Sequence, residues 1–291
     1  MNELSLRRAS AAASRRRALS AIAGAGALGA LGATGLLGLS GCGGGGDEAE
    51  TSSTTTTSTG STGTTTANTG TVSTNPASCS VVPEETAGPY PADGSMASNT
   101  TYNVLALAGI VRSDIRSNIG SSTQVGGVPL TLTLTLTNAS ASCASLAGYA
   151  IYLWHCSREG NYSVYTTSNV SDNALRGVQE TNASGQVTFT TIVPGCYAGR
   201  MPHMHLEVYP SLAKATTASN KVKTTQLAFP TETLRTVYST ASGYTASLNN
   251  LGNISFASDN VFSDGTSLEM VTMAGSVSAG YTANISIAIA A

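Results

Sequence analysis

Residues 130–137 read Leu130-Thr131-Leu132-Thr133-Leu134-Thr135-Leu136-Thr137, an unbroken alternation of apolar and hydroxyl side chains. In a β-strand this period of two places the leucines on one face and the threonines on the other. A strand with one apolar face packs that face on a core, as strands of antiparallel sheets commonly do. The run therefore predicts a long strand in a sheet that covers a hydrophobic core.

Similar patterns, bounded by Gly, Pro, Asn or Ser, occur further along the chain. Residues 102–111, 149–155, 186–192, 203–209 and 224–229 read as further strands. No segment shows a convincing amphipathic helix. Many short strands with turn residues between them predict an all-β fold, an antiparallel β-sandwich in a single domain. The Ser/Ala/Gly-rich chain from residue 251 onward is expected to supply closing strands, and we find no candidate chemistry in it.

The first 41 residues have the pattern of an export signal. Arginines precede a Gly/Ala/Leu stretch that ends in Leu39-Ser40-Gly41-Cys42. This ending resembles a bacterial lipobox, in which the cysteine becomes the lipidated first residue. Weak hydrophobicity makes the alternative, a retained membrane helix, less favoured. Because Ser14-Arg15-Arg16 resembles a twin-arginine signal, export by either the general or the twin-arginine route stays open.

Residues 42–78 are rich in Gly, Ser and Thr, and Val72 is their only branched aliphatic residue. They predict a disordered tether between a lipid on Cys42 and a folded domain at 79–291. The expected location is the cell envelope, on the periplasmic or surface side. Loss of the signal removes five of the 14 basic and one of the 16 acidic side chains, which leaves nine and fifteen. A net charge of −6 gives no electrostatic reason to bind nucleic acid.

Four cysteines remain once Cys42 is set aside: Cys79, Cys143, Cys156 and Cys196. An even number is typical of disulfides formed in an oxidising compartment. A Cys143–Cys156 pair is the least expected, because the strand-like segment between these residues carries them apart. The other two connectivities stay open, as do free buried thiols.

Two phenols and two imidazoles form a candidate metal site. His203 and His205 lie at i and i+2 of a predicted strand, so both rings project from the same face. Tyr197 stands just before that strand after a Pro-Gly turn, and Tyr162 follows a Gly-Asn turn. Phenolate oxygen is a hard donor that favours Fe(III) over Zn(II) or Cu(I). The four residues therefore predict a non-haem Fe(III) centre.

The chain resembles the intradiol ring-cleavage dioxygenases, the catechol and protocatechuate dioxygenase family, and in particular their short exported bacterial members. The resemblance spans roughly residues 79 to 229, and Arg-x-x-His-x-His with Pro-Gly-x-Tyr just upstream is its most specific part. The matching stretches are Pro83 to Tyr90, Ser113 to Arg116, Gly127 to Leu130, Trp154 to Tyr162, Leu175 to Gly177, Gly185 to Tyr197, Arg200 to His205 and Thr224 to Leu227.

The resemblance implies a role for each matching residue. Tyr162, Tyr197, His203 and His205 should bind one Fe(III), with Tyr197 and His205 axial and with Tyr197 also accepting a substrate proton. Arg200 should lie over the substrate ring as a catalytic and substrate-binding residue. Gln226 should share this role in the same pocket, and Tyr90 should approach the substrate. His155 matches no ligand position.

The activity implied is cleavage of a catechol-type diol by O₂ to a muconate-type diacid, a step in the catabolism of aromatic compounds. Cys196, Met201 and the long spacing between His205 and Gln226 depart from the family pattern without removing a ligand. One alternative is a tethered β-sandwich for binding or adhesion, with a structural metal or none. Another is a Cu- or Zn-carrying envelope protein. The particular catechol and the oligomeric state stay open.

Overall fold

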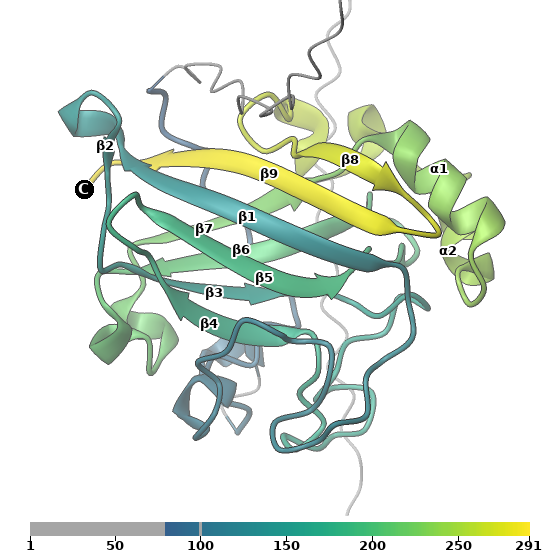
Figure 1. Ribbon diagram of the computed structural model, residues 1–291, viewed down its shortest axis with the longest axis horizontal. Coiled ribbons are helices and arrows are strands. Elements are labelled where there is room, and N and C mark those ends of the chain that lie inside the picture. The colour runs from purple at the N-terminus through teal and green to yellow at the C-terminus, as the bar shows by residue number, and fades with distance from the viewer. Residues whose placement is uncertain (1–78, 99–100) are drawn as a thin grey trace, which may run out of the picture. The chain divides into compact units, whose positions relative to one another are not determined.

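The computed structural model describes residues 79–98 and 101–291, in which β-strands form two sheets (Figure 1). The predicted signal at 1–41 and the predicted tether at 42–78 lie outside the described residues. Two layers of sheet confirm the expected β-sandwich.

The first sheet has the strand order β2-β1-β9-β8, and β5 pairs with β1 along the same edge as β2, over Pro129 to Thr135. Its strands are β1 (Pro129–Asn138), β2 (Ala144–Ser145), β5 (Gln186–Ile192), β8 (Thr272–Ser276) and β9 (Gly280–Ile289). The second sheet has the order β4-β3-β6-β7. Its strands are β3 (Ala150–Trp154), β4 (Arg176–Glu180), β6 (His203–Tyr209) and β7 (Lys223–Ala228).

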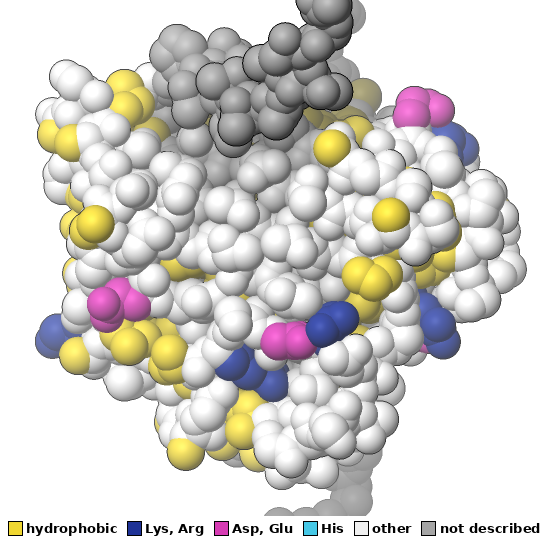
Figure 2. Space-filling model, viewed as in Figure 1, with side chains coloured by type: hydrophobic (Ala, Val, Ile, Leu, Met, Phe, Trp, Pro, Cys, Tyr) yellow, Lys and Arg dark blue, Asp and Glu magenta, His cyan; other side chains and the backbone are white. Residues whose placement is uncertain are grey.

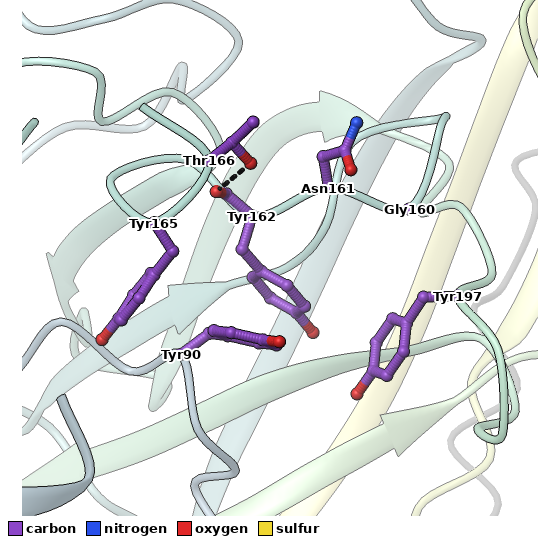
Figure 3. Close-up of a pocket in the computed structure, with 7 residues that line it drawn as sticks. All are labelled: Tyr90, Gly160, Asn161, Tyr162, Tyr165, Thr166 and Tyr197. Atoms are coloured by element: carbon purple, nitrogen blue, oxygen red, sulfur yellow. Dashed lines mark hydrogen bonds between the residues drawn. The ribbon is translucent and has the colours of Figure 1, made fainter. Parts of the chain in front are cut away.

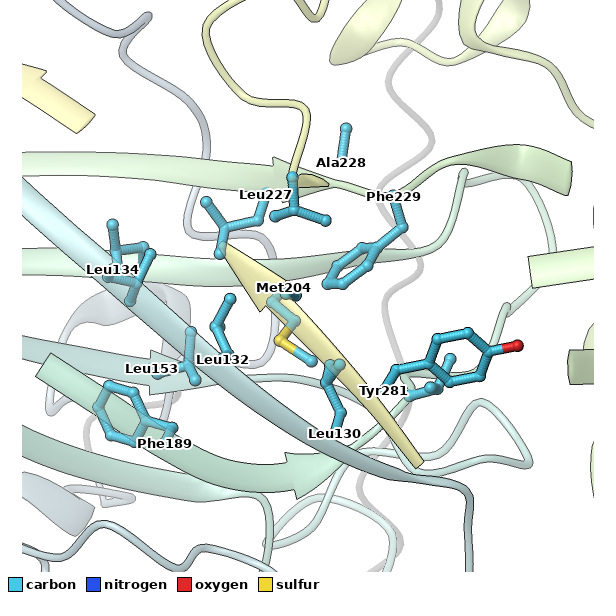
Figure 4. Close-up of a cluster of buried hydrophobic side chains, with 14 of the residues drawn as sticks. Leu130, Leu132, Leu134, Leu153, Phe189, Met204, Leu227, Ala228, Phe229 and Tyr281 are labelled. Carbon is cyan, nitrogen blue, oxygen red and sulfur yellow. The ribbon is translucent and has the colours of Figure 1, made fainter. Parts of the chain in front are cut away.

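The alternation of β1 creates the main core. Leu130, Leu132, Leu134 and Leu136 are all buried, whereas the threonines between them are partly exposed. These leucines face Met204, Leu153 and Leu227 of the second sheet (Figure 4). The sequence pattern of β1 therefore determines which face of the first sheet packs on its partner.

The second sheet is covered on both faces, which its sequence does not show. Every residue of β6 is buried. Met204, Leu206 and Val208 belong to the main core, whereas Tyr209 belongs to a second buried cluster with Tyr152 and Trp154 of β3. Residues of the segment before β1, such as Ala92 and Val104, complete this second cluster. The outer face of the sheet is therefore a protected surface on which polar side chains can be buried.

One strand pair departs from the predicted antiparallel arrangement, because β1 and β9 are parallel. Tyr281, Ala283 and Ile287 of β9 still turn toward the same core as the leucines. Strand alternation predicts which face is buried but carries no information on direction. The closing strands expected after residue 251 are present as β8 and β9.

Helices are also present where none was predicted. They are α1 (Thr231–Thr240) and α2 (Thr245–Leu251), with 3₁₀ turns η1 (Met96–Ser98), η2 (Val104–Ala106), η3 (Ala139–Ala141), η4 (Leu212–Lys214), η5 (Ala218–Asn220), η6 (Phe256–Ser258) and η7 (Phe262–Asp264). In α1 the buried residues Leu234, Val237 and Tyr238 follow the i, i+3, i+4 spacing of an amphipathic helix. This short signal was missed.

The predicted strand at 102–111 is wrong. The segment forms η2 and a loop, and the Asn103 side chain accepts a hydrogen bond from the Leu105 backbone, which caps the turn. Val104, Leu105 and Ile110 are buried, so their apolar character reflects packing and not strand pairing. By contrast, the predicted strands 186–192 and 203–209 are confirmed residue for residue.

Cys79 and Cys143 form a disulfide, whereas Cys156 and Cys196 are free and buried. Both possibilities left open by the sequence, a disulfide and free thiols, therefore occur together. All three histidines are buried, and none shows on the face drawn in Figure 2, where charged side chains are sparse. Within the described residues no helix is long and apolar enough to cross a membrane.

Candidate active site

Four side chains predicted as metal ligands converge on the outer face of the second sheet. His203 and His205 stand side by side on β6, and their Nε2 atoms are 3.1 Å apart. The Tyr197 hydroxyl is 3.3 Å from His203 Nε2, and the Tyr162 hydroxyl is 3.2 Å from His205 Nε2. Two phenol oxygens and two imidazole nitrogens thus form a continuous chain of donor atoms, in which Tyr162, His203 and His205 are buried and Tyr197 is partly exposed.

A turn that needs glycine positions Tyr162. The Ser157 carbonyl accepts a hydrogen bond from the Gly160 N–H, the Ser157 N–H donates one to the Asn161 carbonyl, and Gly160 has a φ of +90°. A Cβ at Gly160 would lie 3.3 Å from the Cα of Tyr197. Glycine therefore permits both the backbone conformation and the close approach of the two tyrosine-bearing loops.

The C-terminal helices hold the loop that carries Tyr197. Tyr238 of α1 donates a hydrogen bond of 2.7 Å to the Pro194 carbonyl. From α2, Ser247 accepts from the Cys196 backbone N–H and Asn250 donates to the Cys196 carbonyl, each at 2.8 Å. The peptide before Tyr197 is thus bound on both sides, which fixes where the phenol can point.

The donor set fits a metal ion. His203 Nδ1 lies 2.6 Å from the Met201 carbonyl oxygen, which cannot donate, so Nδ1 carries the proton and the Nε2 lone pair faces the cluster. Ligands bound at about 2.1 Å are separated by roughly 3.0 Å at right angles and roughly 3.4 Å in a tetrahedron. The donor distances of 3.1–3.3 Å match this range.

Phenols are essential to this donor set. Among residues 79–98 and 101–291, no three His, Cys, Asp or Glu side chains gather into a group that could hold a metal ion. Two imidazoles with two phenols would supply four ligands, the phenols after loss of their protons. That combination suits a hard, highly charged cation.

Burial dominates the electrostatics of the cluster. It lowers the pKa of His203 to about 3, with a smaller contribution from the Arg200 charge. It also lowers the pKa of His205 well below the ordinary value, so both imidazoles are neutral and able to bind a cation. Burial raises the pKa of Tyr162 well above its ordinary value. Burial likewise raises the pKa of Tyr197 to about 12, opposed by the charge of Arg200.

The segment before η1, which carries Gly88 and Tyr90, packs against His205 and Tyr162 of the cluster. Gly88, with φ of +65°, passes so close that a Cβ there would lie 3.3 Å from Cε1 of His205. Tyr90 stacks on Tyr162 with ring centroids 4.7 Å apart. The hydroxyls of Tyr90, Tyr162 and Tyr197 point toward one region, whereas that of Tyr165 points away (Figure 3).

A cavity of about 230 Å³ opens beside these phenols. It is lined by Tyr90, Gly160, Asn161, Tyr162, Tyr165, Thr166 and Tyr197. Tyr90 therefore lines a small, mostly aromatic pocket together with Tyr162 and Tyr197 of the donor cluster.

Arg200 and Gln226 lie together beside the donor cluster and are not among the residues that line the cavity. Arg200 Nη2 donates a hydrogen bond of 2.6 Å to Gln226 Oε1, and Gln226 Nε2 donates to the Thr86 carbonyl. The hydrogen bond and charge of Arg200 both act to lower the pKa of Tyr197. The structure thus brings every sequence-predicted site residue into one neighbourhood.

His155 has hydrogen-bond partners of its own outside the four-donor cluster. Its Nδ1 lies 2.8 Å from the Cys156 carbonyl and its Nε2 lies 2.6 Å from the Thr191 hydroxyl. Burial lowers its pKa to about 4. Both ring nitrogens of this neutral imidazole are therefore engaged within the protein.

Arg176, which belongs to the matching stretch Leu175 to Gly177, connects two segments of the site. The buried guanidinium donates to the carbonyls of Tyr90 and Pro91, and to the hydroxyl and carbonyl of Ser163. It therefore ties the segment that carries Tyr90 to the loop that carries Tyr162. The sequence does not indicate this role, because the partners of Arg176 are distant along the chain.

Asp259 was missed altogether, in a region where no chemistry was expected. It accepts hydrogen bonds from Arg200 Nε at 2.9 Å and 3.1 Å. An aspartate in a Ser-rich loop carries no periodicity or motif that would connect it with Arg200.

A family model described as "Dioxygenase" matches residues 109–236. An intradiol ring-cleavage dioxygenase from Tetranychus urticae is 25% identical, with a TM-score of 0.55 over 72% of this chain and 94% of that chain. A further dioxygenase crystal structure is 23% identical, with a TM-score of 0.56 over the same shares. No curated protein matches.

Proposed function

Since the chain belongs to the intradiol ring-cleavage dioxygenases, we propose that it cleaves a catechol-type aromatic diol with O₂ at a non-haem Fe(III) ion. The product is a muconate-type diacid that contains both atoms of O₂. The observation that carries this proposal is the convergence of the Tyr162 and Tyr197 hydroxyls with His203 Nε2 and His205 Nε2. A binding or adhesion module without a metal would have no need of these four donors.

Tyr162, Tyr197, His203 and His205 would together hold the metal. Fe(III) held there would supply Lewis acidity that favours deprotonation of the diol. Neutral, buried imidazoles need not lose a proton before they bind, whereas each phenol must lose one. The fixed loops around Tyr162 and Tyr197 support a site formed before the metal arrives.

Tyr197 is the phenol that accepts a substrate proton in this proposal. Its oxygen faces both the cluster and Arg200, whose charge opposes the effect of burial on the Tyr197 pKa. A tyrosinate that becomes protonated can serve as a general base for one of the two diol protons. Tyr162, whose hydroxyl lies 3.2 Å from His205 Nε2, would serve only as an oxygen donor to the metal.

Arg200 and Gln226 would face the reacting ring. A fixed guanidinium stabilises negative charge that develops on the ring more strongly in a buried site than in water. Gln226 holds the Nη2 edge of Arg200, and the Thr86 carbonyl holds Gln226. Tyr90 would contact the bound diol from the cavity side, and the cavity of about 230 Å³ favours a compact aromatic ligand.

The proposed place of action is the cell envelope, where a lipid on Cys42 would anchor the domain. The Cys79–Cys143 disulfide supports an oxidising compartment. Substitution of Cys42 by Ala should release the protein from membranes, and the released protein should retain its activity if Cys42 serves only as an anchor.

The direct test is conversion of catechols by the iron-loaded protein. The expected result is a ring-opened diacid that carries both labelled atoms when ¹⁸O₂ is supplied, together with a broad visible absorption from tyrosinate-to-Fe(III) charge transfer. The zinc-loaded protein, the matched control, should be colourless and inactive. A coloured iron protein that converts no catechol would favour the binding-module alternative.

A further inference from the structure

We propose that Asp259 is a positioning residue that fixes the guanidinium of Arg200 in the active site. The expected effect on catalysis rests on the proposed function, whereas the contact between Asp259 and Arg200 does not. Asp259 lies between η6 and η7, outside residues 109–236 that match the family model. Its carboxylate accepts from Arg200 Nε at 2.9 Å and 3.1 Å.

The carboxylate is itself immobile. Oδ2 accepts from the Met201 backbone N–H at 2.6 Å, and Oδ1 accepts from the backbones of Val261 and Phe262 at 2.8 and 3.1 Å. The side chain of Asp259 is fully buried. Burial alone would raise its pKa, but the hydrogen bonds from these three backbone groups and from Arg200 outweigh burial and lower it. Asp259 is thus a charged, rigid anchor.

The anchor determines the plane of the guanidinium. Asp259 binds Nε, Gln226 binds Nη2, and the ring of Phe262 lies 5.7 Å from the guanidinium carbon. A planar group held at two separate nitrogens cannot rotate without breaking one contact. Asp259 and Phe262 of the C-terminal segment and Gln226 of β7 therefore fix the orientation of the guanidinium relative to Tyr197.

Arg200 needs such an anchor because a competing partner is near. Its side chain is 12% exposed, and its charge acts on the half-buried carboxylate of Glu85. Arginine has a long flexible stem, and without Asp259 it could turn toward Glu85 or solvent. A displacement of this kind would leave the metal ligands in place and remove only the charge beside the ring.

The test compares Asp259→Asn with Asp264→Asn in the full, iron-loaded chain. The amide introduced by Asp259→Asn keeps one oxygen for the backbone groups but presents no negative charge to Arg200. Asp264 is exposed in the adjacent η7 and serves as the matched control. Asp259→Asn should retain iron and colour and lose about 10- to 100-fold in kcat/KM, whereas Asp264→Asn should stay within about two-fold of wild type.

A double-mutant cycle separates positioning from a general structural role. If Asp259 acts only through Arg200, Asp259→Asn should change kcat/KM by less than about two-fold when Arg200 is already Ala. The same loss in both backgrounds, or an Asp259→Asn variant with wild-type kcat/KM, would overturn the proposal. If Asp259→Asn does not fold, Arg200→Lys decides. Lysine keeps the positive charge but lacks the two separate nitrogens that bind Asp259 and Gln226. Wild-type activity of Arg200→Lys would therefore also overturn the proposal.

A readout without metal or turnover distinguishes this inference from the proposed function. In ¹H–¹⁵N spectra of the metal-free protein, the Arg200 Nε–H should exchange slowly with solvent, and this protection should disappear in Asp259→Asn. If wild type cleaves no catechol but the protected signal behaves as stated, the proposed function fails and the anchoring of Arg200 stands. An Nε–H equally protected in Asp259→Asn refutes the anchoring itself.

Discussion

Trp154 lies flat against His205, with ring centroids 4.8 Å apart and planes inclined by 5°. Tyr152 also stacks on Trp154, with ring centroids 4.8 Å apart. All three residues are buried and come from the adjacent strands β3 and β6. The stack gives His205 a rigid backing, so the imidazole has little freedom to rotate away from the other donors.

The first prediction uses this stack as a reporter. Trp154 is the only tryptophan of the chain, so its fluorescence reports directly on the ring it contacts. Titration of the metal-free protein with Fe(III) should quench most of the emission, because a paramagnetic ion on His205 would lie within a few ångströms of the indole. A fluorescence titration measures the effect.

The matched control is His205→Ala, which removes the ligand and leaves Trp154. This variant should show little quenching over the same range of iron concentration. Equal quenching in both proteins would mean that iron binds elsewhere, and would contradict the assignment of His205.

The second prediction concerns the phenols. Tyr162→Phe removes one oxygen donor but keeps the ring that stacks on Tyr90. It should shift the visible absorption and weaken iron binding, by about 10- to 100-fold if it resembles other losses near a metal. Tyr165→Phe is the control, because the Tyr165 hydroxyl bonds the Ala92 backbone and not the cluster. If both variants kept the same colour and iron content, Tyr162 would not be a ligand.

The third prediction separates charge stabilisation from metal binding. Arg200→Ala should retain iron and visible colour, because Arg200 is not among the four donors. Turnover of catechols should fall by about 2–4 kcal/mol of barrier, roughly 30- to 900-fold in rate. Steady-state kinetics beside an iron assay measure both quantities. Loss of iron, or full activity under O₂, would show that the assigned role is wrong.

The fold could be predicted wherever alternation is strong. The leucine face of β1 and the segments 186–192 and 203–209 were predicted from period two alone. The same rule failed at 102–111, where apolar residues are buried by a capped turn. The parallel pairing of β1 with β9 could not be predicted, because strand direction depends on the path of the chain and not on side-chain pattern.

Three of the four candidate ligands could be grouped from the sequence because they lie in one compact motif, whereas Tyr162 lies 43 residues before His205. His203 and His205 share one face of a strand, and Tyr197 is only six residues from His203. Arg176 and Asp259 were missed as supporting residues because their partners are distant in sequence. Asp259 is 59 residues from Arg200, and Arg176 is 86 residues from Tyr90. Their roles depend on tertiary packing alone.

The last prediction concerns Glu269, whose buried carboxyl group makes stability depend on pH. Its Oε2 has no hydrogen-bond partner among the described residues, and burial, with the charge of Glu85, raises its pKa to about 8. The folded protein therefore keeps this proton up to about pH 8, whereas the unfolded chain loses it above the ordinary value of 4.5. Because the folded state binds more protons in this window, the free energy of unfolding should fall as pH rises from about 5 to 8, by on the order of 1–3 kcal/mol.

Glu269→Gln removes the ionisation and keeps the shape, so its stability relative to wild type should increase by that amount across the window. Urea unfolding at about pH 5, 6.5 and 8 measures this gap, and subtraction of the two proteins cancels other titrating groups. A gap that stays constant with pH would show that Glu269 titrates normally in the folded state.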